Sequence, residues 1–399
     1  MYDAIIVGAR AAGSPTGMLL ARKGHRVLVV DRAGFPSDTL STHYIHQPGI
    51  ARLRCWGLLD RLIATGCPPS RSLAFDVGAF ALTGTPPPSD GVAEGYAPRR
   101  TVLDSLLLEA AAEAGAEVRT GFPVDELVLE DGAVVGIRSG TTVERGRVVV
   151  GADGRNSFVA RAVQAPEYDT RPSLACAYYT YWSGVEGGDV ELYPREGRMV
   201  MGGARTNDGL NIVIVFWPKN EFRAVRTDVE RSFHEALALA PQLAERLATG
   251  ERADRFYGIG DLPFYYRRPY GPGWVLVGDA GYHKDPITAQ GITDAFRDAE
   301  LLADALDAGF TGTRPPDEAL ADYERTRNEE TRGLYELTYE FASLAPPTAE
   351  QQTLFGALRT NKEDTNRFFG VVAGTVRPDE FFAPENLERI VGAPVPQRV

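Results

Sequence analysis

The order of apolar and polar residues along the first thirty positions predicts a strand, a helix and a second strand. Residues 3–7 (DAIIV) and 26–31 (RVLVVD) are apolar runs, and residues 14–24 between them carry a helical pattern. A strand–helix–strand unit is typical of a parallel sheet covered by helices. We therefore predict that the chain begins a doubly wound α/β sheet.

The pattern changes to period-two alternation in the middle of the chain. Alternation with many aromatic residues is typical of an antiparallel sheet. Strands are predicted at 174–184, 188–194, 197–203 and 209–218, with one amphipathic helix at 227–248. Earlier helices are expected at 50–66 and 101–115, and residues 316–344 also read as a helix.

Composition and charge exclude several classes of protein. The chain has 399 residues with a net charge of -12, and its basic residues are not gathered into a stripe that could follow a nucleic-acid backbone. No signal-like N-terminus or apolar run of about 18 residues occurs, so we expect a cytoplasmic protein with no integral membrane segment. Three irregularly spaced cysteines, Cys55, Cys67 and Cys176, predict neither a disulfide framework nor a metal site.

The stretch VGARAAGSPTG follows the first strand and resembles a dinucleotide-binding fingerprint with one departure. Gly8 and Gly13 fill the outer glycine positions, but Arg10 stands where the middle glycine is usual. The following helix would still direct free N–H groups at a phosphate. Asp31, at the end of the second strand, is placed to bind ribose hydroxyls. An ordinary strand–turn–helix would read the same way.

Two further motifs combine an acid with small residues at the end of a strand. Asp153 and Gly154 follow RVVV, and Asp279 follows WVLVG. The second of these motifs continues through Asp285 into a helix that begins near Gly291. Carboxylates at strand ends can bind sugar or ribityl hydroxyls, and a helix start can present N–H groups to an electron-rich ring. A structural turn would need only one of these features.

Together the three motifs resemble the FAD-dependent aromatic-hydroxylase superfamily, the single-component flavoprotein monooxygenases, to which geranylgeranyl reductases and flavin-dependent halogenases are related. The resemblance covers roughly residues 2–343. It implies that Gly8 and Gly13 frame the FAD pyrophosphate, that Asp31 holds the ribose and that Asp279 contacts the ribityl or pyrophosphate part. The remaining residues that we expect to bind FAD are Arg10, Ala12, Arg32, Thr42, Arg100, Val124, Asp153, Gly154, Pro286, Gln290, Gly291 and Ile292.

The implied fold is α/β, with a Rossmann-like FAD-binding domain, an antiparallel β-sheet substrate domain and a helical C-terminal tail. We predict that the FAD-binding domain is discontinuous and consists of residues 1–70, 99–164 and 271–343. The substrate domain would consist of residues 71–98 and 165–270, and the tail of residues 344–399.

Four positions depart from the hydroxylase pattern: Arg10, Tyr282 in place of histidine, Asp285 in place of a proline, and Thr293 in place of asparagine. The pair Asp285-Pro286 is closer to halogenases and isoprenoid reductases. Halogenases, however, also have a WxWxIP signature and an early catalytic lysine. This chain has neither, since no lysine falls between Lys23 and Lys219.

The resemblance implies an FAD-dependent monooxygenase that uses NAD(P)H and O2 to hydroxylate or epoxidise a small apolar or aromatic molecule through a flavin C4a-hydroperoxide. The alternative is a flavin-dependent reductase or dehydrogenase acting on carbon–carbon bonds. No second fingerprint is present, so NAD(P)H would bind transiently, or a partner would reduce the flavin. A homodimer is possible, and the tail could pack on the FAD domain or on a second subunit.

Candidate catalytic and substrate residues come from loops and from the aromatic strands. His43, His46 and His283 lie in polar loops, where one of them could act as a general base. Loop histidines also often serve only to link loops. Arg10 could bind the pyrophosphate with its guanidinium, or it could point into solvent. Substrate-pocket candidates are Tyr179, Tyr181, Phe216 and Tyr265.

Overall fold

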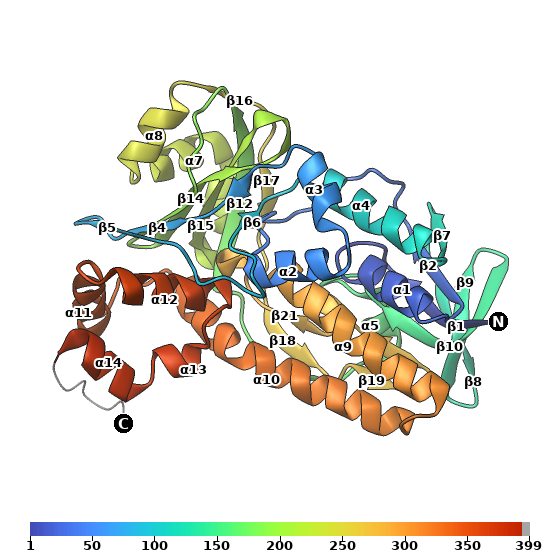
Figure 1. The fold of residues 1–399 in the computed structure, drawn as a ribbon. Coiled ribbons are helices and arrows are strands. Elements are labelled where there is room, and N and C mark those ends of the chain that lie inside the picture. Colours follow the sequence, from blue (N-terminus) through green and yellow to red (C-terminus); the bar gives the residue numbers. More distant parts are fainter. Residues whose placement is uncertain (393–399) are drawn as a thin grey trace.

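The computed structural model describes residues 1–392 and contains two main sheets (Figure 1). The first has the order β19-β20-β10-β1-β2-β7. Its strands are β1 (Tyr2–Val7), β2 (Val27–Asp31), β7 (Glu117–Thr120), β10 (Thr142–Gly151), β19 (Tyr270–Gly271) and β20 (Trp274–Leu276). All of these strands are parallel to their neighbours except β19, which forms an antiparallel edge. The chain therefore begins with the predicted strand–helix–strand unit.

The two faces of the first sheet are covered differently. Alternate residues of β1, such as Ala4 and Ile6, pack against α1 (Gly13–Arg22), α4 (Arg100–Glu113) and α9 (Gly291–Thr311). Ile5 and Val7 point to the opposite face, where they meet the hairpin of β8 (Glu126–Glu130) and β9 (Ala133–Ser139) and the short α5 (Phe158–Ala162). Because both faces are buried at the centre of the sheet, β1, β2 and the last residues of β10 are nearly continuous apolar runs.

The second sheet has the order β16-β12-β15-β14-β13-β4-β5. Its strands are β4 (Leu73–Asp76), β5 (Ala81–Gly84), β12 (Ala175–Ser183), β13 (Val190–Arg195), β14 (Arg198–Arg205), β15 (Asn211–Pro218) and β16 (Glu251–Arg252), with β17 (Tyr257–Ile259) pairing to β12. Neighbours are antiparallel except β13 and β4, which run parallel. The predicted antiparallel sheet is thus correct apart from this one pair.

One face of the second sheet packs on helices and the other faces the rest of the molecule. Tyr178, Trp182 and Trp217 meet α7 (Val229–Leu237) and α8 (Pro241–Leu247), which follow η2 (Lys219–Glu221) and α6 (Phe222–Thr227). The prediction of a single helix at 227–248 is wrong, because the segment divides before Pro241, whose preceding residue avoids helical geometry. The predicted helix at 50–66 divides similarly, into α2 (Gln47–Cys55) and α3 (Leu59–Ala64) around Gly57 with φ of 76°.

The C-terminal helices pack on the second sheet. α10 (Pro316–Ala342) leads to α11 (Ala349–Leu358), α12 (Lys362–Ala373), α13 (Pro378–Phe381) and α14 (Pro384–Val391). In α12, Asn366 accepts a hydrogen bond from the backbone N of Thr85, and Lys362 donates to the carbonyl of Thr83. The tail therefore rests on β5 and its flank rather than chiefly on the first sheet.

Smaller elements join the two sheets. A three-stranded sheet of β11 (Glu167–Arg171), β18 (Phe264–Arg267) and β21 (Tyr282–His283) lies between them, and β3 (Pro69–Ser70) pairs with β6 (Gly95–Tyr96). Besides η2, the described 3₁₀ helices are η1 (Asn207–Gly209), η3 (Gly278–Ala280) and η4 (Pro286–Thr288). The predicted fold class is confirmed, whereas the exact domain limits remain a prediction. Over residues 1–392, no helix combines the length and the apolar character needed to cross a membrane.

Candidate functional site

The sequence motifs meet at one edge of the first sheet. Val7 lies beside Val30 and Gly151, and Gly151 lies beside Leu276, so β1, β2, β10 and β20 end together. The fingerprint, Asp31, the Asp153-Gly154 pair and the Asp279 motif all follow these strand ends. In open α/β sheets, ligands bind outside the carboxyl ends of the strands. The structure therefore gathers the predicted nucleotide-binding residues along the edge where a dinucleotide would lie.

Positions 8 and 13 both require glycine, because backbone atoms of neighbouring segments lie too close to leave room for a Cβ. A Cβ on Gly8 would lie 2.4 Å from the carbonyl oxygen of Ala152, and one on Gly13 would lie 1.8 Å from that of Gly8. Gly8 also has a φ of 105°, which favours glycine. At the third motif, a Cβ on Gly278 would lie 2.8 Å from the side chain of Ala12. The three motifs therefore touch one another, forming a backbone cradle that fits a dinucleotide phosphate.

Asp31 holds the loops on either side of it. Its carboxylate accepts hydrogen bonds from the backbone N of Ala9 at 2.9 Å and of Ala33 at 2.8 Å. Arg32 next to it is exposed. Val124, beyond the end of β7, is half-buried against the hairpin side of the sheet. The roles of these three residues toward FAD remain predictions.

Arg10 is tied to the protein in this structure. Its guanidinium donates to Asp104 at 2.6 Å and to the side chain of Ser37 at 2.9 Å. Asp104 also accepts two hydrogen bonds from Arg100, at 2.8 and 3.1 Å. The idea that Arg10 points into solvent is wrong, because the fully buried Asp104 on α4 draws the guanidinium inward. A contact between Arg10 and the pyrophosphate remains a prediction.

Asp153 has one carboxylate oxygen engaged and one free. Oδ2 accepts from the backbone N of Phe158 at 2.6 Å and of Val159 at 3.1 Å, which caps the start of α5. Oδ1 is buried without a partner among the described residues. Burial raises the pKa of this carboxyl. An unsatisfied oxygen at this edge fits a site that accepts a hydrogen bond from a ligand hydroxyl.

The third motif surrounds the start of α9. Asp279 is exposed within η3, Pro286 begins η4, Gly291 opens α9 and Ile292 packs into the core below. Gln290 is buried, and its side chain donates to the carbonyl of Val372 in α12 at 2.6 Å. Gln290 therefore ties the motif to the C-terminal helices.

A buried charge cluster that sequence reasoning missed lies beneath this motif. Lys284 pairs with Asp294 and donates to the Tyr282 hydroxyl at 2.9 Å, and Arg297 pairs with Asp294 at 2.9 Å and with Asp298 at 2.6 Å. Burial alone would raise the pKa of Asp294, but the two cations lower it. Lys284, Asp294 and Tyr282 line a small polar cavity together with Gly278, Asp279 and Gly291. In the sequence, only the spacing of Asp294, Arg297 and Asp298 in α9 indicates such a cluster.

Asp285, one of the departures from the hydroxylase pattern, caps η4. Its Oδ1 accepts from the backbone N of Ile287 at 2.9 Å, and its Oδ2 is buried without a partner in the described part of the chain. Burial raises the pKa of Asp285 to about 7. The residue thus holds the turn that leads toward a second, larger cavity.

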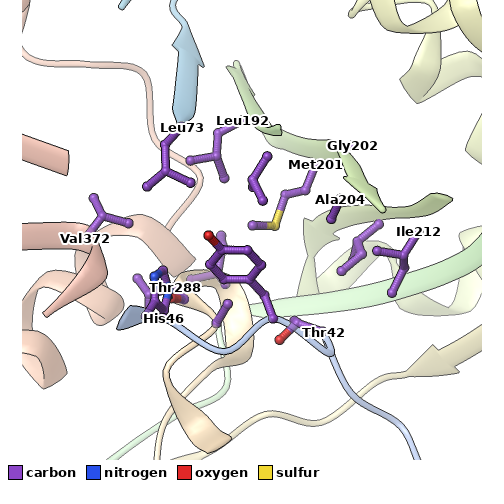
Figure 2. A pocket seen from close by; sticks show the side chains of 15 residues that line it. Thr42, His46, Leu73, Leu192, Met201, Gly202, Ala204, Ile212, Thr288 and Val372 are labelled. Carbon is purple, nitrogen blue, oxygen red and sulfur yellow. The ribbon is translucent and has the colours of Figure 1, made fainter. Parts of the chain in front are cut away.

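This second cavity, of about 40 Å³, lies between the second sheet and the segment 287–289 (Figure 2). Figure 2 shows apolar side chains from the sheet on two sides and His46 with Thr288 at the opposite end. Two residues named from the sequence, Thr42 and His46, line it. Sequence reasoning missed the other lining residues, which are Tyr44, Leu73, Val190, Leu192, Met201, Gly202, Ala204, Ile212, Ile214, Ile287, Thr288, Ala289 and Val372.

The three candidate histidines occupy different places. His43 lies between the carbonyl of Ser41 and the hydroxyl of Tyr181, both at 2.8 Å, and burial followed by the charge of Arg100 lowers its pKa to about 3. His283 contacts the carbonyl of Pro263, and burial lowers its pKa. Of the three, only His46 lines the apolar cavity.

The four aromatic candidates are buried but do not line the cavity. Tyr179, Tyr181 and Phe216 lie on the face of the second sheet that turns toward the cavity, as their parity predicts. Tyr179 stacks on Tyr257 at 5.2 Å, so its ring belongs to the packed core. Tyr265 donates to the carbonyl of Asp279 at 2.7 Å and thereby supports the third motif.

Gly291→Ala tests where the flavin lies. A Cβ at Gly291 would meet no described atom within 4 Å, so the protein itself accommodates alanine, which also favours a helix by up to about 1 kcal/mol. If the isoalloxazine rests against Gly291, the methyl group should weaken FAD binding roughly tenfold or more while the apoprotein melts at an equal or higher temperature. Fluorescence titration of apoprotein with FAD measures the affinity.

Gly356→Ala in α11 is the matched control, because a Cβ there also meets no described atom within 4 Å. It should leave FAD affinity unchanged. Equal affinity in the Gly291 and Gly356 variants would place the flavin away from the start of α9.

Comparison with known proteins identifies the family. Residues 1–338 match the model of the FAD binding domain family. The chain is 26% identical over 326 residues to a 1H-pyrrole-2-carbonyl-[peptidyl-carrier protein] brominase of Pseudoalteromonas luteoviolacea, covering 78% of each chain. It is 27% identical over 364 residues to digeranylgeranylglycerophospholipid reductase 1 of Methanopyrus kandleri, covering 86% of this chain and 91% of the relative.

Solved structures show the same fold. The myxobacterial chondrochloren halogenase superposes with a TM-score of 0.79 at 22% identity, covering 100% of this chain and 98% of the other. A probable FAD-dependent monooxygenase from Pseudomonas aeruginosa superposes with a TM-score of 0.70 at 24% identity, covering 93% and 99%. Because residues 1–338 match the family model and the glycine cradle fits a dinucleotide, the chain is a member of the FAD binding domain family and an FAD-dependent oxidoreductase.

Proposed function

We propose that this protein is a monooxygenase that inserts one oxygen atom of O2 into a small, uncharged, largely apolar or aromatic molecule. NAD(P)H would supply two electrons, and the second oxygen atom would leave as water. The apolar cavity carries the proposal, since the segment 287–289 that forms one of its walls belongs to the loop expected to contact the flavin. A substrate in this cavity would lie next to the cofactor.

The chain's own residues would bind the cofactor, position the substrate and exclude water. Gly8 and Gly13 would allow the backbone to approach the pyrophosphate, and Asp31 would accept from ribose hydroxyls. FAD supplies the redox chemistry and the reaction with oxygen. Apolar side chains of the second sheet and Val372 would keep the reacting atoms dry, which strengthens electrostatic interactions there and limits side reactions.

The names of relatives suggest two reactions other than monooxygenation. The brominase and the halogenase suggest halogenation as an outcome when halide is present. The reductase supports the alternative of hydride addition to a carbon–carbon double bond. We favour monooxygenation because the residues lining the described apolar cavity include no lysine, whereas halogenases depend on one. Lys284 is instead held by Asp294 and Tyr282.

Rapid-mixing absorbance tests the proposal. The bound flavin is reduced without oxygen and mixed with aerated buffer, with and without simple phenols. A transient spectrum that differs from both reduced and oxidised flavin is expected before reoxidation. Product analysis by mass spectrometry, repeated with bromide, would then separate addition of 16 mass units from bromination.

The reductase alternative predicts the opposite behaviour. Reduced flavin would return to its oxidised form without oxygen when an unsaturated isoprenoid is added, and aerated buffer would cause direct reoxidation with no transient. That pair of results would overturn the monooxygenase proposal.

A further inference from the structure

A buried polar atom in the wall of the apolar cavity has no hydrogen-bond partner in the described part of the chain. The fifteen lining residues include no Asp, Glu, Lys or Arg, so the cavity fits an uncharged ligand (Figure 2). His46 is 3% exposed, and its Nδ1 is buried without a hydrogen-bond partner among residues 1–392. Most buried polar atoms in proteins are paired, so this atom requires an explanation.

The protonation of His46 follows from its other ring nitrogen. Nε2 lies 3.0 Å from the carbonyl oxygen of Thr288, which can only accept a hydrogen bond. Nε2 therefore carries the hydrogen, and Nδ1 presents a lone pair. Burial lowers the pKa of His46 to about 4, with Asp294 opposing and Lys284 adding to this effect, so the ring is neutral near pH 7.

The rest of the site keeps His46 in this orientation. The Tyr44 ring meets the imidazole edge-on with centroids 4.8 Å apart. The hydroxyl of Thr288, whose carbonyl holds Nε2, is itself bonded to Thr338 at 2.9 Å. By contrast, both ring nitrogens of His43 are engaged, by Ser41 and by Tyr181. Among the candidate histidines, His46 alone combines a place in the cavity wall with a buried nitrogen that can accept.

We propose that Nδ1 of His46 accepts a hydrogen bond from a ring O–H or N–H of the substrate, and that this contact selects phenols and N–H heteroaromatics over their O-methyl and N-methyl counterparts. The inference names the substrate class of the proposed function. It rests on that function, because only then is the bound ligand a substrate. A buried hydrogen-bond acceptor without a donor has a free-energy cost. A ligand that donates to Nδ1 removes this cost, whereas a methylated ligand does not. The carbonyl of Thr288 fixes which nitrogen accepts.

Binding to the oxidised holoprotein tests the inference without turnover. The probes are 4-ethylphenol with 4-ethylanisole, and indole with N-methylindole, titrated by the change in flavin absorbance and by calorimetry. Wild-type protein should bind each donor about tenfold more tightly than its methylated partner. Equal binding within either pair would overturn the inference whatever the variants do.

Two substitutions assign the selectivity to His46. His46→Phe keeps a ring of similar size but removes the acceptor, so the tenfold preference should fall to about onefold. His46→Asn places a carbonyl oxygen close to the position of Nδ1 and should retain part of the preference. Flavin content and melting temperature show that each variant is folded. A preference that persists in His46→Phe would assign the contact to another residue and overturn the inference.

The binding experiment and the rapid-mixing experiment with oxygen test the two proposals separately. Selective binding of phenols with no transient spectrum would keep the role of His46 and overturn monooxygenation. A transient spectrum with no donor preference would do the reverse.

Discussion

Gly13→Ala is expected to weaken FAD binding by at least roughly a hundredfold. The added Cβ would lie 1.8 Å from the carbonyl oxygen of Gly8 and 3.0 Å from the side chain of Ala152, so the fingerprint loop must move. Backbone atoms cannot relax as a side chain can, and a displacement worth about 3 kcal/mol corresponds to the stated loss of affinity. Fluorescence titration of apoprotein with FAD measures it.

Gly17→Ala, also in α1, is the control that separates loss of stability from loss of FAD affinity. A Cβ there would lie 2.6 Å from a methyl group of Val29, on the face of α1 that packs on the sheet. This variant should lower the melting temperature while FAD affinity changes little. Equal losses of affinity at Gly13 and Gly17 would show that the effect arises from general destabilisation rather than from the phosphate cradle.

The parts of the fold that follow from local pattern were predictable. The central strands β1 and β2 of the first sheet and β12 and β15 of the second are largely apolar and buried on both faces, so short apolar runs identify them as strands. Gly8, Asp31, Asp153 and Asp279 follow strand ends in the sequence. Because parallel strands end at one edge, their convergence could be expected before the structure was known.

Features that depend on distant packing could not be predicted. Asp104 carries no signal in a helix of ordinary composition, yet it joins Arg10 to Arg100. The alternation of β12 correctly separates Tyr179 from Tyr178, whose ring stacks on Phe222 of α6 on the opposite face. It does not show that Tyr257 covers Tyr179 and keeps the ring out of the cavity.

The same limit applies to the loop histidines. His43 and His46 are three residues apart in one polar loop, and their sequence context does not distinguish them. His43 has a φ of 65° and turns toward Tyr181, whereas His46 precedes α2 and reaches Thr288. The contacts come from segments far along the chain, so only the folded structure separates the two roles.

Asp104→Ala is expected to lower the free energy of unfolding by about 3–5 kcal/mol. Asp104 is fully buried and accepts hydrogen bonds from Arg100 at 2.8 and 3.1 Å and from Arg10 at 2.6 Å. Its removal leaves the buried guanidinium of Arg100 without this counter-charge. Denaturant unfolding at a fixed FAD concentration measures the loss.

Glu113→Ala on the same helix is the control, because Glu113 pairs with Arg61 at 2.6 Å on the surface, where 63% of its side chain is exposed. An exposed pair contributes about 0–1 kcal/mol, so this variant should unfold almost as wild type does. Similar small losses in both variants would mean that Asp104 does not hold the two arginines.

Arg10→Gly separates stability from cofactor binding at the same cluster. Asp104 would keep Arg100 as its partner, so the stability loss should be smaller than for Asp104→Ala. If the guanidinium also reaches the pyrophosphate, FAD affinity should fall in Arg10→Gly although the middle glycine of the fingerprint is restored. Unchanged affinity would mean that Arg10 serves to join the fingerprint loop to Asp104 of α4 and to Ser37, as its hydrogen bonds in this structure do.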